Sequence, residues 1–232
     1  MTMQRAFGPT SVNWRYAIGE ITIIVIGILL ALGVDSCNES RISARREHDY
    51  LQRLAVDIRR DIAMFAFTDS LLDGKERALA TVDSALTRSE QLRDTIAFLQ
   101  AVVASSNLGW NQPRVRQITF QDLLSTGNLR LIRDLELRTE IVRYYTTAEG
   151  TYDRVRSRVP DYARRTYELL PRKEEFMYAG PTGGRALAEL VAGVLGSELR
   201  PLVMAEQNFA RFLRQQNSLL REDAVRLLGE IE

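Results

Sequence analysis

Apolar residues recur along most of the chain at steps of three, four and seven, the spacing that places them on one face of an α-helix. The longest stripe comprises Leu51, Leu54, Ile58, Ile62, Phe65, Leu72, Leu79, Val82 and Leu86. Charged runs lie between these positions and predict a solvated opposite face. Because Gly74 falls inside the stripe, the pattern predicts either one very long helix or two helices that meet there.

The same spacing predicts helices over 90–104 and 202–231. Another helix is predicted after Asp134, whose side chain can cap it, with Leu135, Ile141, Val142 and Tyr145 as its apolar residues. No segment alternates polar and apolar residues for long enough to predict a strand. The predicted fold class is therefore all-α, with an N-terminal transmembrane helix that continues into a helical bundle.

Shorter features lie between these helices. Residues 105–116 contain glycine and proline and form the clearest loop. A short helix is predicted over 119–126, with Thr119 as its N-cap and Gly127 at its C-terminal end. The glycine-rich run at 180–185 could hold an anion on backbone N–H groups, but it lacks the Gly-Lys-Ser/Thr of a phosphate loop. We expect a linker or helix entry there.

The N-terminal region contains an apolar run, ITIIVIGILLALGV, at 21–34. Its 14 residues span about 21 Å, which is short of the roughly 30 Å hydrocarbon core of a bilayer. Extending the run to Tyr16 makes it adequate, and we predict a transmembrane helix over 16–36 that runs on as a stalk. A cleaved signal peptide is the alternative, but no lipoprotein-type small-residue motif directly precedes Cys37.

Trp14, Arg15 and Tyr16 are expected to anchor this span at one membrane interface. The two flanks carry nearly equal positive charge, so the positive-inside rule does not choose the orientation. The N-terminal tail holds no acidic residue, and long domains can translocate regardless of charge. We therefore predict a bacterial inner-membrane protein whose main domain is periplasmic. The predicted domains are a tail over 1–15, the span over 16–36, stalk or hairpin helices over 37–104 and a helical domain over 105–232.

Small residues in the predicted span indicate a contact with another transmembrane helix. Gly27 and Ala31 form a small-xxx-small pair, and Gly19 lies two turns before Gly27. Glycine also occurs in spans without a packing role. Glu20 either reaches the headgroup layer or pairs with an Arg, Lys or backbone donor of a partner subunit. The predicted partner-helix face comprises Gly19, Glu20, Gly27 and Ala31.

Composition narrows the possible functions. The 232 residues include 31 basic and 30 acidic ones, so the chain lacks the excess of positive charge that is typical of nucleic-acid-binding proteins. A single cysteine, Cys37, and a single histidine, His48, exclude a disulfide framework and clusters of cysteine or histidine ligands. Carboxylate pairs such as Asp134 and Glu136 are expected on the surface, and His48 on a solvated helix face. We predict no catalytic residues, no cofactor and no metal site.

Two blocks of the sequence resemble a group of uncharacterised bacterial single-pass membrane proteins. The first comprises residues 16–21 (YAIGEI), 25–32 (VIGILLAL) and 38–41 (NESR), and the second comprises residues 119–132 with Glu136, Leu137, Tyr144 and Tyr145. Where that group usually shows Asn-Asn-Trp-Asn-Glu after the span, residues 35–39 read DSCNE and lack the tryptophan. The resemblance implies a membrane-anchored helical domain and no particular activity.

The chain also resembles, in size and arginine-rich composition, the single-pass accessory subunits around the photosynthetic reaction centre and light-harvesting ring of Gemmatimonadota-type bacteria. That resemblance implies scaffolding without pigment binding, because His48 lies outside the predicted span. These observations predict a non-catalytic subunit that stabilises a larger membrane complex through contacts with lipid and other transmembrane subunits. A membrane-anchored binding or sensory module is the alternative, which a large apolar pocket would favour, and an enzyme comes third.

Overall fold

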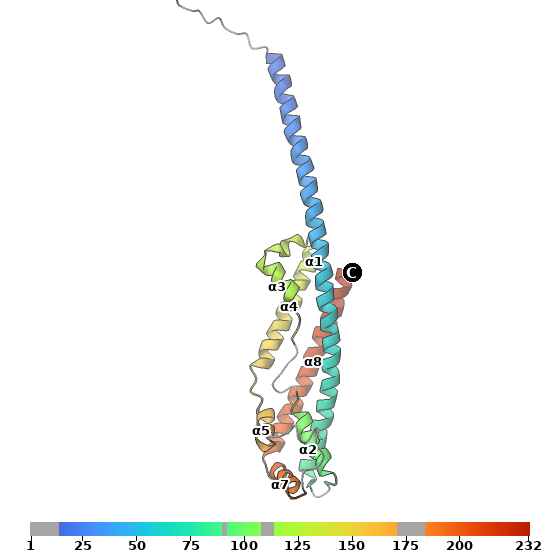
Figure 1. Ribbon diagram of the computed structural model, residues 1–232, viewed down its shortest axis with the longest axis vertical. Coiled ribbons are helices and arrows are strands. Elements are labelled where there is room, and N and C mark those ends of the chain that lie inside the picture. Colours follow the sequence, from blue (N-terminus) through green and yellow to red (C-terminus); the bar gives the residue numbers. More distant parts are fainter. Residues whose placement is uncertain (1–13, 90–91, 108–113, 171–183) are drawn as a thin grey trace, which may run out of the picture. The chain divides into compact units, whose positions relative to one another are not determined.

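The computed structural model describes residues 14–89, 92–107, 114–170 and 184–232, and for residues 15–17, 30–37 and 184–186 it describes only the backbone. The helices are α1 (Trp14–Thr87), α2 (Thr95–Ser105), α3 (Ile118–Ser125), the 3-10 helix η2 (Asn128–Leu131), α4 (Leu135–Arg156), α5 (Asp161–Leu169), α7 (Gly184–Leu195) and α8 (Leu199–Ile231). No strand occurs in these residues, which confirms the all-α fold class (Figure 1).

The chain divides into two compact units, Met1–Asp49 and Tyr50–Glu232. In the first unit, the described residues all belong to α1. The second unit contains the remainder of α1 and all the other described helices. Residues 50–87 of α1 belong to the second unit because they bury their apolar stripe in cores that they share with other helices, α8 among them.

α1 is a single helix of 74 residues that passes through Gly74 without a break. One glycine costs a helix about 1 kcal/mol relative to alanine. Leu72, two residues before Gly74, and Lys75, directly after it, are both buried and hold the helix in place. The apolar stripe predicted either one long helix or two helices that meet at Gly74, and the structure has one long helix.

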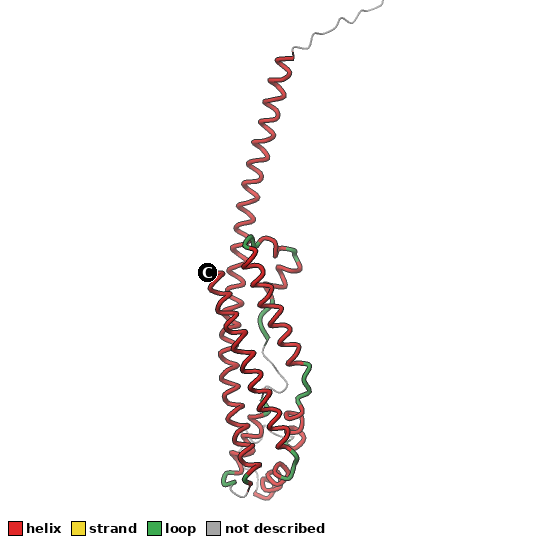
Figure 2. The backbone as a smooth tube through the Cα atoms, turned by 180° about the vertical axis from the view of Figure 1, so that it is seen from behind, coloured by secondary structure: helices red, strands yellow, loops and turns green. Residues whose placement is uncertain are grey.

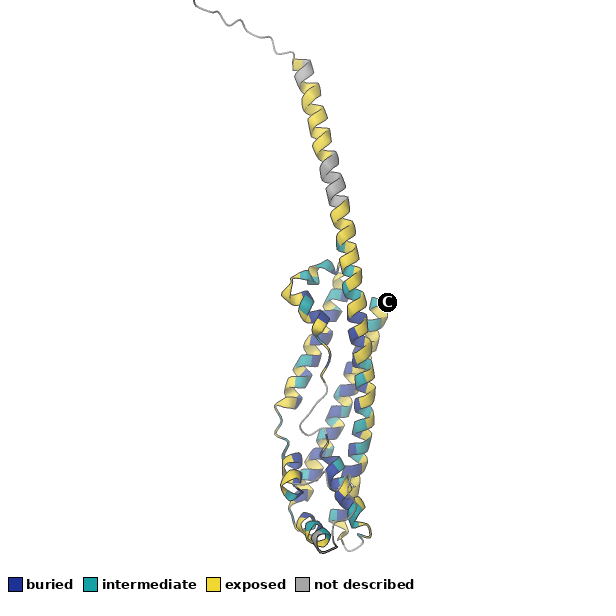
Figure 3. Cartoon of the chain, in the orientation of Figure 1, coloured by how far each residue is buried: buried dark blue, intermediate teal, exposed yellow. Residues whose placement is uncertain are grey.

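In the second unit, α1, α4 and α8 pack on one another, as the two opposite views show (Figures 1 and 2). Their facing sides are buried and their outer sides are exposed (Figure 3). The core nearest Tyr50 includes Leu54, Ile58, Phe120, Leu123, Ile132, Ile141, Tyr144, Tyr145, Ala224 and Leu227. A second core includes Leu79, Val82, Phe98, Leu99, Val102, Tyr162, Val194, Leu199 and Val203.

The start of α3 differs from the prediction. α3 begins at Ile118, and its N-cap residue is Gln117, which makes no side-chain capping bond. Thr119 is therefore not the N-cap, and that prediction is wrong. Its side chain faces the core instead, where the hydroxyl donates a hydrogen bond to Asp57 Oδ2 at 2.7 Å. A bond to another helix has thus replaced the local one.

Other helix ends follow the sequence. Gly127 terminates α3 with a φ of +68°, the left-handed conformation that glycine adopts without steric cost. Asp134 caps α4 as predicted, since its Oδ1 accepts hydrogen bonds from the backbone N–H groups of Glu136 and Leu137 at 2.9 and 3.1 Å. Both signals depend only on residues within a few positions of the helix end.

Two helices start elsewhere than predicted. α2 begins at Thr95, after the predicted residue 90, because Asp94 caps it by accepting a hydrogen bond from the N–H of Ala97 at 2.9 Å. α8 begins at Leu199, before the predicted residue 202. α7 begins at Gly184, within the predicted helix entry, while residues 180–183 lie outside the described residues.

Candidate functional site

Residues 18–29 of α1 present exposed apolar side chains around most of the helix. Ile18, Ile21, Ile23, Ile24, Val25, Ile26, Ile28 and Leu29 are between 47% and 74% exposed. Figure 3 shows this stretch exposed around its circumference. Successive residues of an α-helix point about 100° apart, so these apolar side chains surround the segment except on the side that holds Glu20 and Gly27. Helices of this kind occur where protein or lipid covers them.

The polar and small residues of this segment lie on defined faces. Glu20 and Gly27 are seven residues apart, hence about 20° apart around the helix, and both are exposed. A Cβ added at Gly19 or Gly27 would meet nothing within 4 Å, so either position can accept a neighbouring helix. The hydroxyl of Thr22 donates to the carbonyl of Ile18 at 2.8 Å and so is satisfied within α1.

The remaining predicted interface residues are less fully described. Trp14 begins α1 and is 73% exposed. The side chains of Arg15, Tyr16 and Ala31 lie outside the described residues, as does that of Cys37. No helix among the described residues combines the length and the apolar character needed to cross a membrane.

The second unit buries an ion pair that the sequence analysis missed. Lys75 is 1% exposed, and its Nζ lies 2.6 Å from Oε1 of Glu206. The same ammonium donates to the carbonyls of Ser105 and Asn107, at 2.7 and 2.6 Å. Burial lowers the pKa of Lys75, and the nearby Glu206 carboxylate partly opposes that shift. With its donors engaged, the ammonium ties α1, α8 and the end of α2 together.

Glu206 has a second cationic partner. Arg158, which follows α4, donates to Oε2 of Glu206 at 2.6 Å. The Arg158 guanidinium lies 3.9 Å from the ring centroid of Phe209, within the range of a cation–π contact. Both oxygens of the carboxylate therefore face cations, so the group is already neutralised by this chain. Such an arrangement stabilises helix packing and leaves no free acid or base for chemistry.

A second buried polar cluster joins α1 to the segment before α3. Asp61 accepts two hydrogen bonds, from the backbone N–H of Arg116 at 2.8 Å and from the hydroxyl of Tyr144 at 3.0 Å. Asp57 Oδ2 accepts from the backbone N–H of Thr119 at 3.3 Å and from its hydroxyl at 2.7 Å. Burial, reinforced by the charge of Asp57, raises the pKa of Asp61 to about 6.

Tyr145 lies in the same core beside this cluster. Its ring stacks on Phe120 with centroids 4.4 Å apart and meets Tyr144 edge-on at 5.0 Å. Burial raises the pKa of both tyrosines. Within the described residues, the buried hydroxyl of Tyr145 has no hydrogen-bond partner, whereas that of Tyr144 donates to Asp61.

One sequence signal could have revealed these groups. Each buried charged residue occupies a position where its own helix places apolar residues. Lys75 falls between Leu72 and Leu79 of the α1 stripe, and Glu206 falls between Val203 and Ala210 of α8. A charged residue at a core position is rare unless it is paired, so its position alone predicts a partner but not which one.

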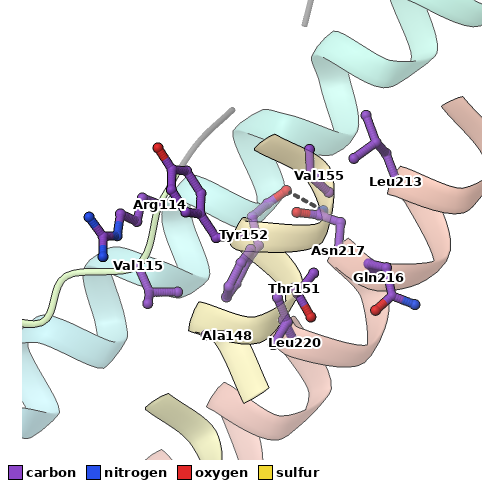
Figure 4. Close-up of a pocket in the computed structure, with 11 residues that line it drawn as sticks. Arg114, Val115, Ala148, Thr151, Tyr152, Val155, Leu213, Gln216, Asn217 and Leu220 are labelled. Carbon is purple, nitrogen blue, oxygen red and sulfur yellow. Dashed lines mark hydrogen bonds between the residues drawn. The ribbon is translucent and has the colours of Figure 1, made fainter. Parts of the chain in front are cut away.

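A small cleft of about 60 Å³ opens between α1, α4, α8 and residues 114–115 (Figure 4). On one side, the Arg114 guanidinium lies over the ring of Tyr152 at 4.9 Å and pairs with Glu149 at 2.5 Å. On the other, Nδ2 of Asn217 donates to the carbonyl of Phe65 at 2.9 Å, the bond drawn in Figure 4. Ligand pockets usually occupy about 300–1,000 Å³, so this cleft is too small for such a ligand.

A second hollow, of about 330 Å³, lies open to solvent at the turn from α1 to α2 and is lined by residues such as Ser84, Arg88 and Arg93. Leu92 and Phe98 also line it, so the hollow is largely apolar, but it is open to solvent, unlike an enclosed ligand pocket. Among the described residues, no three His, Cys, Asp or Glu side chains are grouped so as to hold a metal ion. His48 is exposed, as predicted.

The chain matches no protein-family model, no curated protein and no solved structure. The resemblances noted from the sequence therefore stay predictions, and function is argued from the geometry of the described residues.

Proposed function

We propose that this chain is a non-catalytic, membrane-anchored subunit that stabilises a larger membrane protein complex. The observation that supports the proposal is the apolar surface of residues 18–29, which surrounds α1 in that stretch except where Glu20 and Gly27 lie. A protein with such a surface needs lipid or other apolar helices around it. In this proposal, residues 16–36 lie in the bilayer and the second unit lies outside it.

The free energies involved favour covering residues 18–29 with lipid or protein, even though the segment contains one acidic residue, Glu20. Burying a Leu, Ile or Val side chain contributes about 1.5–3 kcal/mol, and this segment exposes eight of them. A carboxylate inside a span costs a few kcal/mol, and less near the membrane boundary. The apolar contribution therefore exceeds the cost of Glu20 several-fold. Glu20 then determines the depth and rotation of the segment without preventing its insertion.

The buried ionisable groups favour a structural role over a catalytic one. Lys75 and Arg158 both pair with Glu206, and the carboxylates of Asp57 and Asp61 are engaged by hydrogen bonds from their neighbours. One described cleft is too small for a typical ligand and the other is open to solvent. We propose that the second unit acts through its surface, as a scaffold in the periplasm, and that the photosynthetic complex implied by the resemblance is a candidate partner.

The anchor is tested by washing native membranes that contain the C-terminally tagged chain with alkaline carbonate. The chain should stay in the membrane fraction, and its release would overturn the anchor. Protease added to spheroplasts should remove everything after about residue 38 if the main domain is periplasmic. Full protection would reverse the proposed orientation.

The partner contact is tested on mildly solubilised membranes. The wild-type chain should co-purify in stoichiometric amount with a larger complex, and pigment absorbance would identify a photosynthetic one. Gly27→Leu should reduce that recovery without lowering the amount of chain in the membrane. Thr22→Leu is the control, because it places the same leucine side chain about 140° around the helix from Gly27. Equal recovery of both variants would overturn the partner face.

Glu20 is tested by removing its charge and then its polarity. Pairing with a donor of a partner subunit predicts that Glu20→Leu inserts as well as wild type but is recovered less with the complex, with Glu20→Gln intermediate. If Glu20→Leu is recovered at the wild-type level, Glu20 only marks the membrane boundary.

A further inference from the structure

We propose that Asp57 and Asp61 form a proton-operated clasp that holds residues 114–119 on α1, and that a proton on Asp61 tightens it. The clasp lies wholly within the second unit, so it is independent of the membrane anchor. It extends the proposed function by giving the scaffold a response to acidity.

The geometry of the clasp joins three parts of the unit. Asp57 and Asp61 are one helical turn apart on the buried face of α1, 6% and 1% exposed. The segment before α3 donates to Asp61 through the N–H of Arg116, and the first turn of α3 donates to Asp57 through the N–H and hydroxyl of Thr119. The hydroxyl of Tyr144 brings α4 to the same carboxylate. These bonds hold a segment that has no regular structure from 114 to 117.

The charges around the clasp disfavour two ionised carboxylates. Asp57 contributes a like charge one turn away. Among the described residues, no cationic side chain lies within ion-pair distance of either carboxylate. Arg116 is the cation that acts on Asp61, but its side chain is exposed. α4 contributes the neutral hydroxyls of Tyr144 and Tyr145, and α8 contributes Asp223, a further negative charge that acts on Tyr144.

Protonation is compatible with every contact of Asp61. The proton comes from solvent and binds Oδ2, which then donates to the oxygen of Tyr144 while the phenolic O–H rotates away. Oδ1 keeps the hydrogen bond from the N–H of Arg116. One of two neighbouring buried charges is thereby removed, and the hydrogen bond between Asp61 and Tyr144 is kept with its direction reversed. The clasp is therefore tighter when Asp61 is neutral.

The direction of the pH response follows from the pKa of Asp61, which burial raises from 3.8 to about 6. The closed clasp binds the proton more strongly than an opened, hydrated one does. Its stabilisation is thus gained as the pH falls through about 6 and is fully present below 3.8. Between pH 7.5 and pH 5, this single group should make opening about tenfold rarer.

Hydrogen exchange on the full chain tests the clasp at the amides of Arg116 and Thr119. After correction for intrinsic exchange, opening should be about tenfold rarer at pH 5 than at pH 7.5 in the wild type. Asp61→Asn should show no such change. Asp83→Asn, which alters a less buried aspartate of α1, should keep the wild-type response. A wild type without a pH response, or the same response in Asp61→Asn, would overturn the proposal.

A second variant keeps the test decisive if Asp61→Asn does not fold. Tyr144→Phe removes a hydrogen bond that lowers the pKa of Asp61 while leaving the ring in place. The midpoint of the exchange response should therefore move to higher pH. The pH at which the infrared carbonyl band of the protonated carboxyl appears should move in the same direction. An unchanged midpoint would reject Asp61 as the responsible group.

Discussion

Lys75 and Glu206 form an ion pair between α1 and α8, with 2.6 Å between Nζ and Oε1, and their side chains are 0% and 1% exposed. Each charge has given up its hydration, so each depends on the other for compensation. The Arg158 side chain, which is 25% exposed, can still reach water from the other side of the carboxylate. The three side chains connect helices that are distant in sequence.

Removing one partner of this pair should be strongly destabilising. Glu206→Gln leaves the ammonium of Lys75 buried without a counter-charge, and we expect the free energy of unfolding to fall by about 3–5 kcal/mol. Urea unfolding followed by circular dichroism measures the change. The double variant Lys75→Met/Glu206→Leu should recover most of the loss, because neither charge then remains buried.

An exposed ion pair provides the control for that experiment. Arg214 contacts Asp73 and Glu76 at 2.7 and 3.0 Å but is 36% exposed. We expect Arg214→Gln to cost no more than about 1 kcal/mol. Losses of equal size in Glu206→Gln and Arg214→Gln would contradict the role assigned to burial.

Gly127 and Gly150 should respond in opposite directions to the same substitution. Gly127 has a φ of +68°, where an added Cβ costs about 1–2 kcal/mol, so Gly127→Ala should destabilise the unit. Gly150 lies exposed within α4, and a Cβ there meets nothing within 4 Å. Gly150→Ala should therefore stabilise the unit by about 0.5–1 kcal/mol. Thermal unfolding of the two variants checks both signs, and a loss in Gly150→Ala would contradict the open space described there.

Asp134→Ala should weaken the start of α4. The carboxylate satisfies two backbone N–H groups, and losing such a cap costs about 0.5–2 kcal/mol. Asp134→Asn keeps an accepting side-chain oxygen and should stay close to wild type. Denaturant unfolding of both variants tests the cap. If Asn is as damaging as Ala, the charge and not the hydrogen bonds holds the helix end.

The neighbouring tyrosines of α4 make a further matched pair. Within the described residues, the buried hydroxyl of Tyr145 has no hydrogen-bond partner, so Tyr145→Phe should stabilise the unit by about 1 kcal/mol. Tyr144→Phe removes the bond to Asp61 and should destabilise it by about 1.5–3 kcal/mol at neutral pH. Unfolding midpoints in urea compare the two. A loss of stability in Tyr145→Phe would mean that its hydroxyl does find a partner.

Much of the fold follows from short-range features of the sequence. The 3.6-residue periodicity predicts α1, α4 and α8, because burying one face of a helix requires apolar residues at that spacing. Gly127 and Asp134 mark helix ends through bonds and conformations that involve only adjacent residues. Thr119 shows where such reasoning stops, since its hydroxyl had a local partner available and bonds to Asp57 of another helix instead.

The sequence by itself determined that this chain is helical, where most helices run, and that residues 21–34 hold no charge, because these properties depend on residue type and local spacing. Only the tertiary structure decided that Lys75 meets Glu206 and that Asp61 meets Arg116 and Tyr144. The charged positions in the apolar stripes are visible in the sequence, but the identity of each partner depends on which helix faces it and at what height. That alignment results from the packing of the whole core, and the sequence of a single segment is not enough to determine it.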